Sequence, residues 1–102
     1  MQIQTYRSKM AITKVDANQA VIVDALQRVG AVVESLASVG HGVPDLLCGF
    51  AGKITLLEVK SRPNARLTPL QVGWHRKWAG YPVYIVHNEA EALHALGVEL
   101  DG

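Results

Sequence analysis

The sequence predicts an α/β domain in which helices cover the faces of a mixed β-sheet. The chain has 102 residues, a length that fits one domain. Hydrophobic residues make up 49% of it and charged residues 19%, so the chain can bury a core. Helical periodicity and short apolar runs follow one another in the order α-β-β-β-α-β-α. An antiparallel meander followed by a helical crossover produces a mixed sheet with helices on its faces.

The composition excludes several classes of protein. Cys48 is the single cysteine, which excludes an intrachain disulfide framework and a cysteine-rich zinc site. No apolar run approaches the roughly 20 residues needed to cross a bilayer. Residues 1–14 lack the apolar segment of a signal peptide. We therefore expect a protein of a reducing, cytoplasmic compartment without contact to a membrane.

Charge is unevenly distributed along the chain. All ten basic residues lie within residues 1–88, whereas residues 89–102 carry four acids and no base. The segment 53–77 has six bases against the single acid Glu58. A basic patch of this kind attracts phosphate backbones, although an ordinary solvated surface has the same composition.

The first helix is expected after a basic arm at residues 1–15. Apolar residues at one-turn spacing predict a helix over residues 16–29. Asp16 is its expected N-cap, Gln19 the partner in a capping box, and Gly30 the stop signal. The apolar positions of its expected buried face are Ile22, Ala25, Leu26 and Val29.

Four short segments have the composition of strands, namely residues 31–38, 45–50, 53–60 and 82–87. Ala51-Gly52 is short enough to join the second and third segments as an antiparallel hairpin. The centre of the third segment, residues 54–57, is almost entirely apolar or β-branched. This pattern is typical of a central strand covered on both faces.

Several cues mark a second helix after the third strand. Thr68 is the expected N-cap, Pro69 occupies the first turn, and Gln71 closes a capping box. The apolar stripe expected to be buried consists of Leu70, Trp74 and Trp78. Asn88 is the expected cap of a last helix over residues 89–96.

Two acids and one lysine are expected to meet at one end of the sheet. A hairpin turn at residues 51–52 brings Asp45, at the start of one strand, beside Glu58, at the end of the next. Glu58 and Lys60 are two residues apart in one strand, so they point to the same face. Neighbouring carboxylates repel unless a cation neutralises them, and Mg²⁺ binds one or two carboxylates together with water and phosphate oxygens. The carbonyl of Val59 offers a further oxygen ligand.

This group of residues predicts metal-assisted hydrolysis of a phosphodiester. A bound cation polarises the phosphate and lowers the pKa of its water. Lys60 is then placed to orient that water or to stabilise charge on the phosphorus. The alternative interpretation is a surface ion pair between Glu58 and Lys60 with Asp45 nearby, worth about 0–1 kcal/mol.

The same residues resemble a nuclease motif. Pro44-Asp45, a gap of 12 residues and Glu58-Val59-Lys60 have the shape of the PD-(D/E)XK motif. The resemblance is closer to one branch, the virus-type replication-repair nuclease (VRR-NUC) domain. The similar segments are Asn18-Gln19, Gly42-Val43-Pro44-Asp45-Leu46, Leu57-Glu58-Val59-Lys60 and Leu67-Thr68-Pro69-Leu70-Gln71. They occur in the family's order and spacing, and the resemblance covers residues 16–96.

The resemblance implies a restriction-endonuclease-like core over residues 16–102 and a deoxyribonuclease that depends on Mg²⁺ or Mn²⁺. It implies that Asp45, Glu58 and the Val59 carbonyl are metal ligands and that Lys60 is the catalytic lysine. Stand-alone members of this branch look like phage or bacterial proteins. They tend to be homodimers related to Holliday-junction resolvases, so DNA, branched DNA included, is the expected substrate and a second copy the expected partner.

Four further residues on the two helices have a structural and a functional interpretation. The first helix of such nucleases often carries a glutamate, for which Asp16 is a shorter counterpart. Gln19 is either a helix cap or a functional residue. Gln71 is a cap whose amide is also within reach of Lys60, a metal-bound water or a phosphate. His75 lies one turn after Gln71 on the same face, where it either contacts DNA or is a plain surface histidine.

Three residues in loops are candidates for contacts with DNA. Arg62 and Arg66 flank the expected site and suit phosphate contacts. His41 lies in the glycine-rich loop before Asp45, where it either approaches substrate or is incidental.

Two other functions are alternatives to a nuclease. A non-catalytic DNA-binding module on the same fold is the alternative, but a DNA binder has no reason to hold paired acids beside phosphates. A nucleotide-binding or RNA-processing protein of P-loop type is disfavoured because no Gly-Lys-Ser/Thr sequence occurs.

Overall fold

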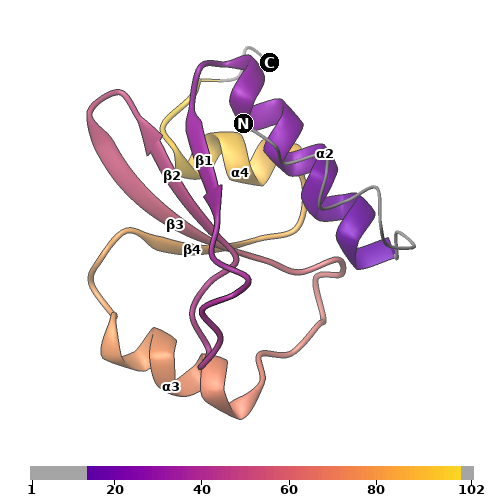
Figure 1. The fold of residues 1–102 in the computed structure, drawn as a ribbon, viewed down its shortest axis with the longest axis vertical. Coiled ribbons are helices and arrows are strands. Elements are labelled where there is room, and N and C mark those ends of the chain that lie inside the picture. Colours follow the sequence, from indigo (N-terminus) through magenta and orange to yellow (C-terminus); the bar gives the residue numbers. More distant parts are fainter. Residues whose placement is uncertain (1–13, 100–102) are drawn as a thin grey trace.

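The computed structural model describes residues 14–99, with side chains from residue 17 onward. Its elements follow the predicted order of helices and strands (Figure 1). They are α2 (Lys14–Arg28), β1 (Val32–Ser35), β2 (Leu46–Phe50), β3 (Lys53–Val59), α3 (Pro69–Lys77), β4 (Val83–Val86) and α4 (Glu89–Ala95).

The four strands form one mixed sheet in the order β1-β2-β3-β4. The first three strands are antiparallel, and β4 runs parallel to β3 after a crossover through α3. The turn between β2 and β3 consists of Ala51 and Gly52, both with positive φ (52° and 79°). Positive φ at both positions matches the right-handed twist of paired strands, so the predicted hairpin is confirmed.

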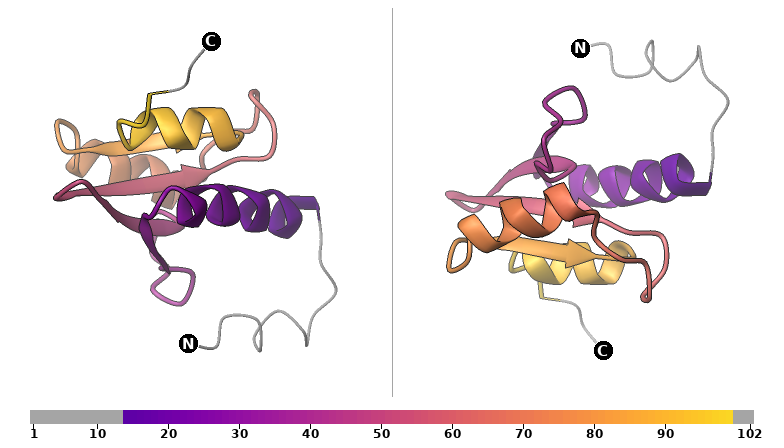
Figure 2. Two further views of the ribbon diagram at one scale, coloured as in Figure 1. Left: turned by 90° about the horizontal axis from the view of Figure 1, so that it is seen from above. Right: turned by 90° about the horizontal axis from the view of Figure 1, so that it is seen from below.

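Helices α2 and α4 cover one face of the sheet and pack against each other (Figure 2). Their buried side chains join those of β2, β3 and β4 in a single core. Burying each large apolar side chain contributes about 1.5–3 kcal/mol, so this face holds the domain together. The core residues are Ile22, Leu26, Ala31, Leu46, Cys48, Leu57, Val59, Val86, Ala92 and Leu96.

The opposite face of the sheet is not covered in the same way. Strand β3 was expected to be covered on both faces, but Ile54 is 67% exposed. Helix α3 is set apart from α2 and α4 (Figure 1) and contacts the C-terminal end of β3 instead of spreading over the strand. The prediction is therefore confirmed for the inner position of β3 in the sheet and wrong for the cover of its N-terminal half, since Leu56 is half-buried and Glu58 is buried on the face where Ile54 is exposed. An apolar strand sequence does not determine what covers it.

The apolar stripe of α3 is likewise not buried. Leu70 is 64% exposed and Trp78 is 40% exposed, while Trp74 is half-buried. The two indole rings stack with centroids 5.1 Å apart. Helical spacing correctly placed these side chains on one face, but within residues 14–99 no other element buries that face.

The start of α2 differs from the prediction. The helix already includes Lys14, so Asp16 lies inside it and is not its N-cap. The expected capping box with Gln19 is therefore wrong, and the Asp16 side chain lies outside the part described. Val29, expected on the buried face, is 38% exposed. The basic arm predicted for residues 1–15 falls mostly outside the described residues.

No helix within residues 14–99 combines the length and the hydrophobicity needed to span a membrane.

Candidate active site

A glycine-rich loop carries the chain from β1 to the first acid of the site. This loop reaches the N-terminal end of α3 (Figure 1). Gly42 has a φ of 83°, and a side chain on it would overlap the main chain of Leu70 and Gln71. Only glycine allows this close approach, so the loop fixes the start of α3 against Asp45's strand. His41, in the same loop, is exposed and has a φ of 58°.

The hairpin brings the two acids together. Leu46 pairs with Leu57, and one further step of the same register places Asp45 opposite Glu58. The Val59 amide donates a hydrogen bond of 2.7 Å to Asp45 Oδ2. This bond holds the Asp45 carboxylate at the end of β3, beside the side chain of Glu58.

The Val59 carbonyl lies at the same end of the sheet. The pairing of β2 with β3 ends at Leu46 and Leu57, so Val59 lies beyond the last paired residue of β2. Its carbonyl oxygen is therefore the main-chain oxygen between Glu58 and Lys60, at the end of the sheet that carries the two acids.

Glu58 is a carboxylate in the interior of the protein. Its side chain is 1% exposed, and its Oε1 has no hydrogen-bond partner. Burial raises the pKa of Glu58 to about 8; Asp45 contributes to the rise and Lys60 opposes it. A buried carboxyl group with a raised pKa is stabilised in its ionised form by a nearby positive charge, such as a metal cation.

Gln71 connects the acid to the lysine. Its Nε2 donates to Glu58 Oε2 (3.1 Å), and its Oε1 accepts from Lys60 Nζ (2.9 Å). The same Oε1 accepts from the Thr68 amide, and Thr68 Oγ1 accepts from the Gln71 amide, which completes the predicted capping box. The cap therefore holds the amide group in the orientation that positions both Glu58 and Lys60.

His75 lies one turn further along α3 and faces the other oxygen of Glu58. Its Nε2 is 3.6 Å from Glu58 Oε1, and the side chain is only 16% exposed. Burial lowers the pKa of His75, and the charge of Lys60 lowers it further, so the imidazole is neutral at pH 7. The sequence allows two interpretations of His75, a DNA contact or a surface histidine, and neither predicts this position. The spacing of four residues from Gln71 was the signal that placed it on the same face.

The other candidate residues are not joined to this group. Arg62 and Arg66 lie exposed in the loop between β3 and α3, and His41 lies exposed in the glycine loop. Gln19 lies half-buried on α2, which packs with α4 and β1. Its neighbour Asn18 donates to the His87 carbonyl (3.3 Å), a contact that joins α2 to the start of α4.

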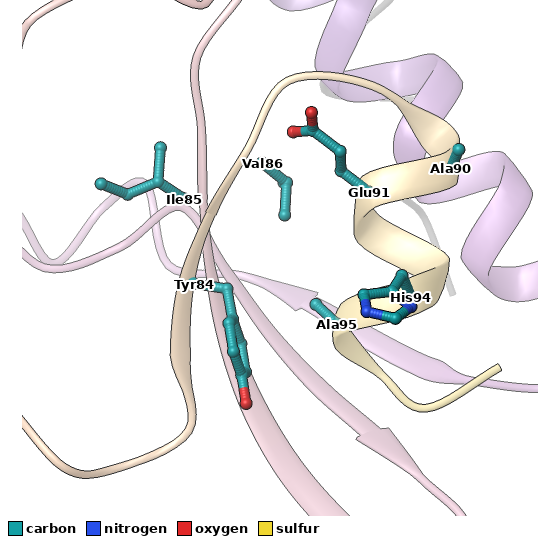
Figure 3. A pocket seen from close by; sticks show the side chains of 7 residues that line it. All are labelled: Tyr84, Ile85, Val86, Ala90, Glu91, His94 and Ala95. Carbon is teal, nitrogen blue, oxygen red and sulfur yellow. The ribbon is translucent and has the colours of Figure 1, made fainter.

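A pocket lies elsewhere, between β4 and α4 (Figure 3). It is open, and its charged group, Glu91, is already bonded to the main chain and ring of His87. None of the predicted site residues lines it. The lining residues are Tyr84, Ile85, Val86, Ala90, Glu91, His94 and Ala95.

Comparison with known proteins yields one informative similarity. No protein-family model matches the sequence, and no curated protein matches it. A solved structure described as a "VRR_NUC domain" superposes on 83% of this chain and 96% of its own, with a TM-score of 0.69 and 27% sequence identity. This likeness confirms the expected fold and the resemblance on which it was predicted.

Proposed function

We propose that this chain, which folds as a VRR-NUC domain and so belongs among nuclease-type domains, hydrolyses DNA phosphodiester bonds with Mg²⁺ or Mn²⁺. The observation that carries the proposal is the buried Glu58 paired with the half-buried Asp45 beside Lys60. A non-catalytic DNA-binding module on this fold is the alternative. It is disfavoured because a module that only binds phosphates has no reason to hold two acids beside Lys60.

The residues present suit a hard divalent cation. Asp45, Glu58 and the Val59 carbonyl offer oxygen ligands at one end of the sheet, and Glu58 Oε1 lacks a partner in a buried setting. These three groups would hold the metal. When bound, such a cation polarises the scissile phosphate and makes a water molecule more acidic.

Lys60 and Gln71 have distinct proposed roles. The Gln71 amide holds the Lys60 ammonium near the acids by a 2.9 Å hydrogen bond, instead of leaving it in solvent. A fixed ammonium there stabilises negative charge that develops on the phosphate, or orients the attacking water. Gln71 thus acts by positioning Lys60 and Glu58 and is expected to matter even without touching substrate.

DNA is the proposed substrate because basic residues surround the site. Arg62 and Arg66 are exposed in the loop that leads from Lys60 to α3. The last turn of α3 adds Arg76 and Lys77, and its first turn has no acid. His41 lies exposed in the loop on the other side of the α3 N-terminus. Asp16 and Gln19 remain proposed accessory residues.

A homodimer acting on branched DNA is the second part of the proposal. Helix α3 exposes Leu70 and Trp78 on one face, an apolar surface that a second copy of the chain would cover. A two-fold dimer has two active sites and suits paired cuts on a four-way junction. This part rests on analogy with phage and bacterial members of the branch.

The decisive experiment incubates the protein with labelled linear, flapped and four-way-junction DNA. We expect no cleavage in EDTA and cleavage when Mg²⁺ or Mn²⁺ is restored, since the ligands are hard oxygens. Glu58→Gln serves as the inactive control. Full cleavage in EDTA would overturn the metal mechanism, and no cleavage of any DNA with either metal would favour the binding module.

A further inference from the structure

Two buried polar atoms in the active site have no hydrogen-bond partner. They are Glu58 Oε1 and His75 Nε2. Among the described residues, no other buried side-chain nitrogen or oxygen lacks a hydrogen-bond partner. Leaving a buried polar atom unpaired is unfavourable. Because both atoms lie in one place and face one another, a single partner between them would satisfy both.

The distance between these atoms identifies the kind of partner. At 3.6 Å they are beyond a hydrogen bond, for which about 2.7–3.2 Å is usual. A bridging water with two bonds of about 2.8 Å at its ordinary angle would hold them about 4.5 Å apart. A cation with bonds of about 2.1 Å to each atom would hold them about 3.0–3.5 Å apart. The observed separation is nearest to that of two ligands sharing one cation.

The chemistry of the two atoms agrees with this geometry. Ionised Glu58 supplies a negative oxygen, and a neutral imidazole supplies a nitrogen lone pair, the form in which histidine binds metals. The Trp74 ring meets the His75 ring edge-on, with centroids 5.6 Å apart, which limits the freedom of the imidazole. Gln71 occupies the other oxygen of Glu58, so Oε1 is the atom left for a cation.

We propose that Glu58 Oε1 and His75 Nε2 bind the same divalent cation, and that this nitrogen ligand makes the site prefer Mn²⁺ to Mg²⁺. Imidazole is a better ligand for transition metals than for Mg²⁺, whose preferred ligands are carboxylate, carbonyl and water oxygens. The inference rests on the proposed metal site at Asp45 and Glu58 and adds a ligand and a metal preference to it.

The site closes around the cation and does not stand preformed. Within the described residues, no three His, Cys, Asp or Glu side chains already form a metal-binding group. Asp45, Glu58 and His75 must therefore draw together on binding. The shift required is small between Glu58 and His75, whose atoms are already 3.6 Å apart.

The test is electron paramagnetic resonance of the protein loaded with Mn²⁺. We expect the bound ion to show electron spin-echo modulation from ¹⁴N, which changes when the protein is labelled with ¹⁵N-histidine. His75→Phe keeps an aromatic ring beside Trp74 but removes both ring nitrogens. We expect this variant to lose the modulation and to bind Mn²⁺ at least about tenfold more weakly, while Mg²⁺ affinity, measured by competition, changes less.

The control is His94→Phe, an exposed histidine on α4, which should match the unmodified protein in both measurements. Mn²⁺ bound without nitrogen modulation would overturn the role of His75 and leave the proposed nuclease site standing. Modulation that persists in His75→Phe would also overturn it. Absence of Mn²⁺ binding, or binding unaffected by Glu58→Gln, would overturn the proposed metal site itself.

Discussion

At the scale of single residues, the burial of Glu58 has a consequence for stability. Burial raises its pKa from 4.5 to about 8. Between these values the native protein holds a proton that the unfolded chain releases, so the free energy of unfolding falls as pH rises through this window. In EDTA, we expect urea to unfold the protein more easily at about pH 8.5 than at about pH 5. Glu58→Gln should weaken this dependence, and an equal pH dependence in both proteins would contradict the assignment.

The acids and the lysine should be separable by their effects. Asp45→Asn and Glu58→Gln each remove a proposed charged ligand, so we expect metal binding and activity to be lost together. Lys60→Ala removes an ammonium, which binds no metal, so activity should fall by about 10²–10³ while Mn²⁺ affinity is largely kept. Calorimetric titration with Mn²⁺ measures the difference. Unchanged affinity in both acid variants would mean that the metal binds elsewhere.

The sequence predicted the juxtaposition of these residues but not all of their contacts. Asp45 and Glu58 could be paired because a two-residue turn determines the register of a hairpin. Gln71 could be placed near Lys60 because a capping box fixes the first turn of a helix. The approach of His75 to Glu58 depends on how α3 sits against the end of β3, and no local pattern encodes that position.

At the scale of elements, Gly42 determines where α3 sits. A methyl group there would overlap the Leu70 carbonyl and lie 2.9 Å from the Gln71 amide nitrogen. Gly42→Ala should therefore displace the start of α3, break the Gln71 bonds to Glu58 and Lys60, and lower kcat at least about tenfold. Gly40→Ala is the matched control, since Gly40 also has a positive φ (71°) but open space around it.

We expect Gly40→Ala to cost about 1–2 kcal/mol of stability from backbone strain and to keep its activity. Urea unfolding and cleavage rates under saturating metal measure both effects. Equal activity in the two variants would show that the loop does not position α3.

The loop between β3 and α3 should determine affinity for DNA and not the chemistry. Arg62 and Arg66 are exposed, so replacing both with alanine should weaken binding of every DNA sequence and lower the salt slope by about two, one per phosphate contact. Mn²⁺ affinity should be unchanged. Arg28→Ala on α2, where Arg28 pairs with Asp24, is the control. A salt slope equal to that of the unmodified protein would place the DNA elsewhere.

Local sequence patterns predicted which segments form helices and strands better than they predicted which side chains are buried. The strands could be predicted because glycine and proline delimit short apolar runs. Helix α3 could be predicted because Thr68, Pro69 and Gln71 are all residues that favour the first turn of a helix. The burial of Leu70 and Trp78 was predicted wrongly, since spacing shows which side chains share a face but not what that face meets. The prediction of Asp16 as an N-cap was wrong because residue types that cap helices also occur inside them.

At the scale of the whole molecule, the hydrophobic core lies on one face of the sheet. Its buried residues lie between the sheet and helices α2 and α4, whereas α3 contributes none. A domain of about 100 residues buries only about two-thirds of its unfolded surface, so an additional interface would add a substantial share of its stability. The exposed apolar side chains of α3 offer one surface for such an interface.

The last prediction concerns this interface and the choice of substrate. Burying Leu70 and Trp78, which are 64% and 40% exposed, would contribute several kcal/mol to a dimer. We expect light scattering to report a dimer at micromolar concentration and the double variant Leu70→Glu, Trp78→Glu to be a monomer. Val21→Glu, a 47% exposed position on α2, is the control and should remain dimeric.

The same variants test whether assembly selects branched DNA. A dimer with two-fold symmetry should cut four-way junctions in symmetric pairs and prefer them to linear duplex, because both sites engage one substrate. The monomeric double variant should lose paired cutting but keep metal-dependent cleavage of each strand, since Asp45, Glu58 and Lys60 come from one chain. A monomeric unmodified protein that cuts all forms of DNA equally would refute junction selectivity while leaving the nuclease chemistry in place.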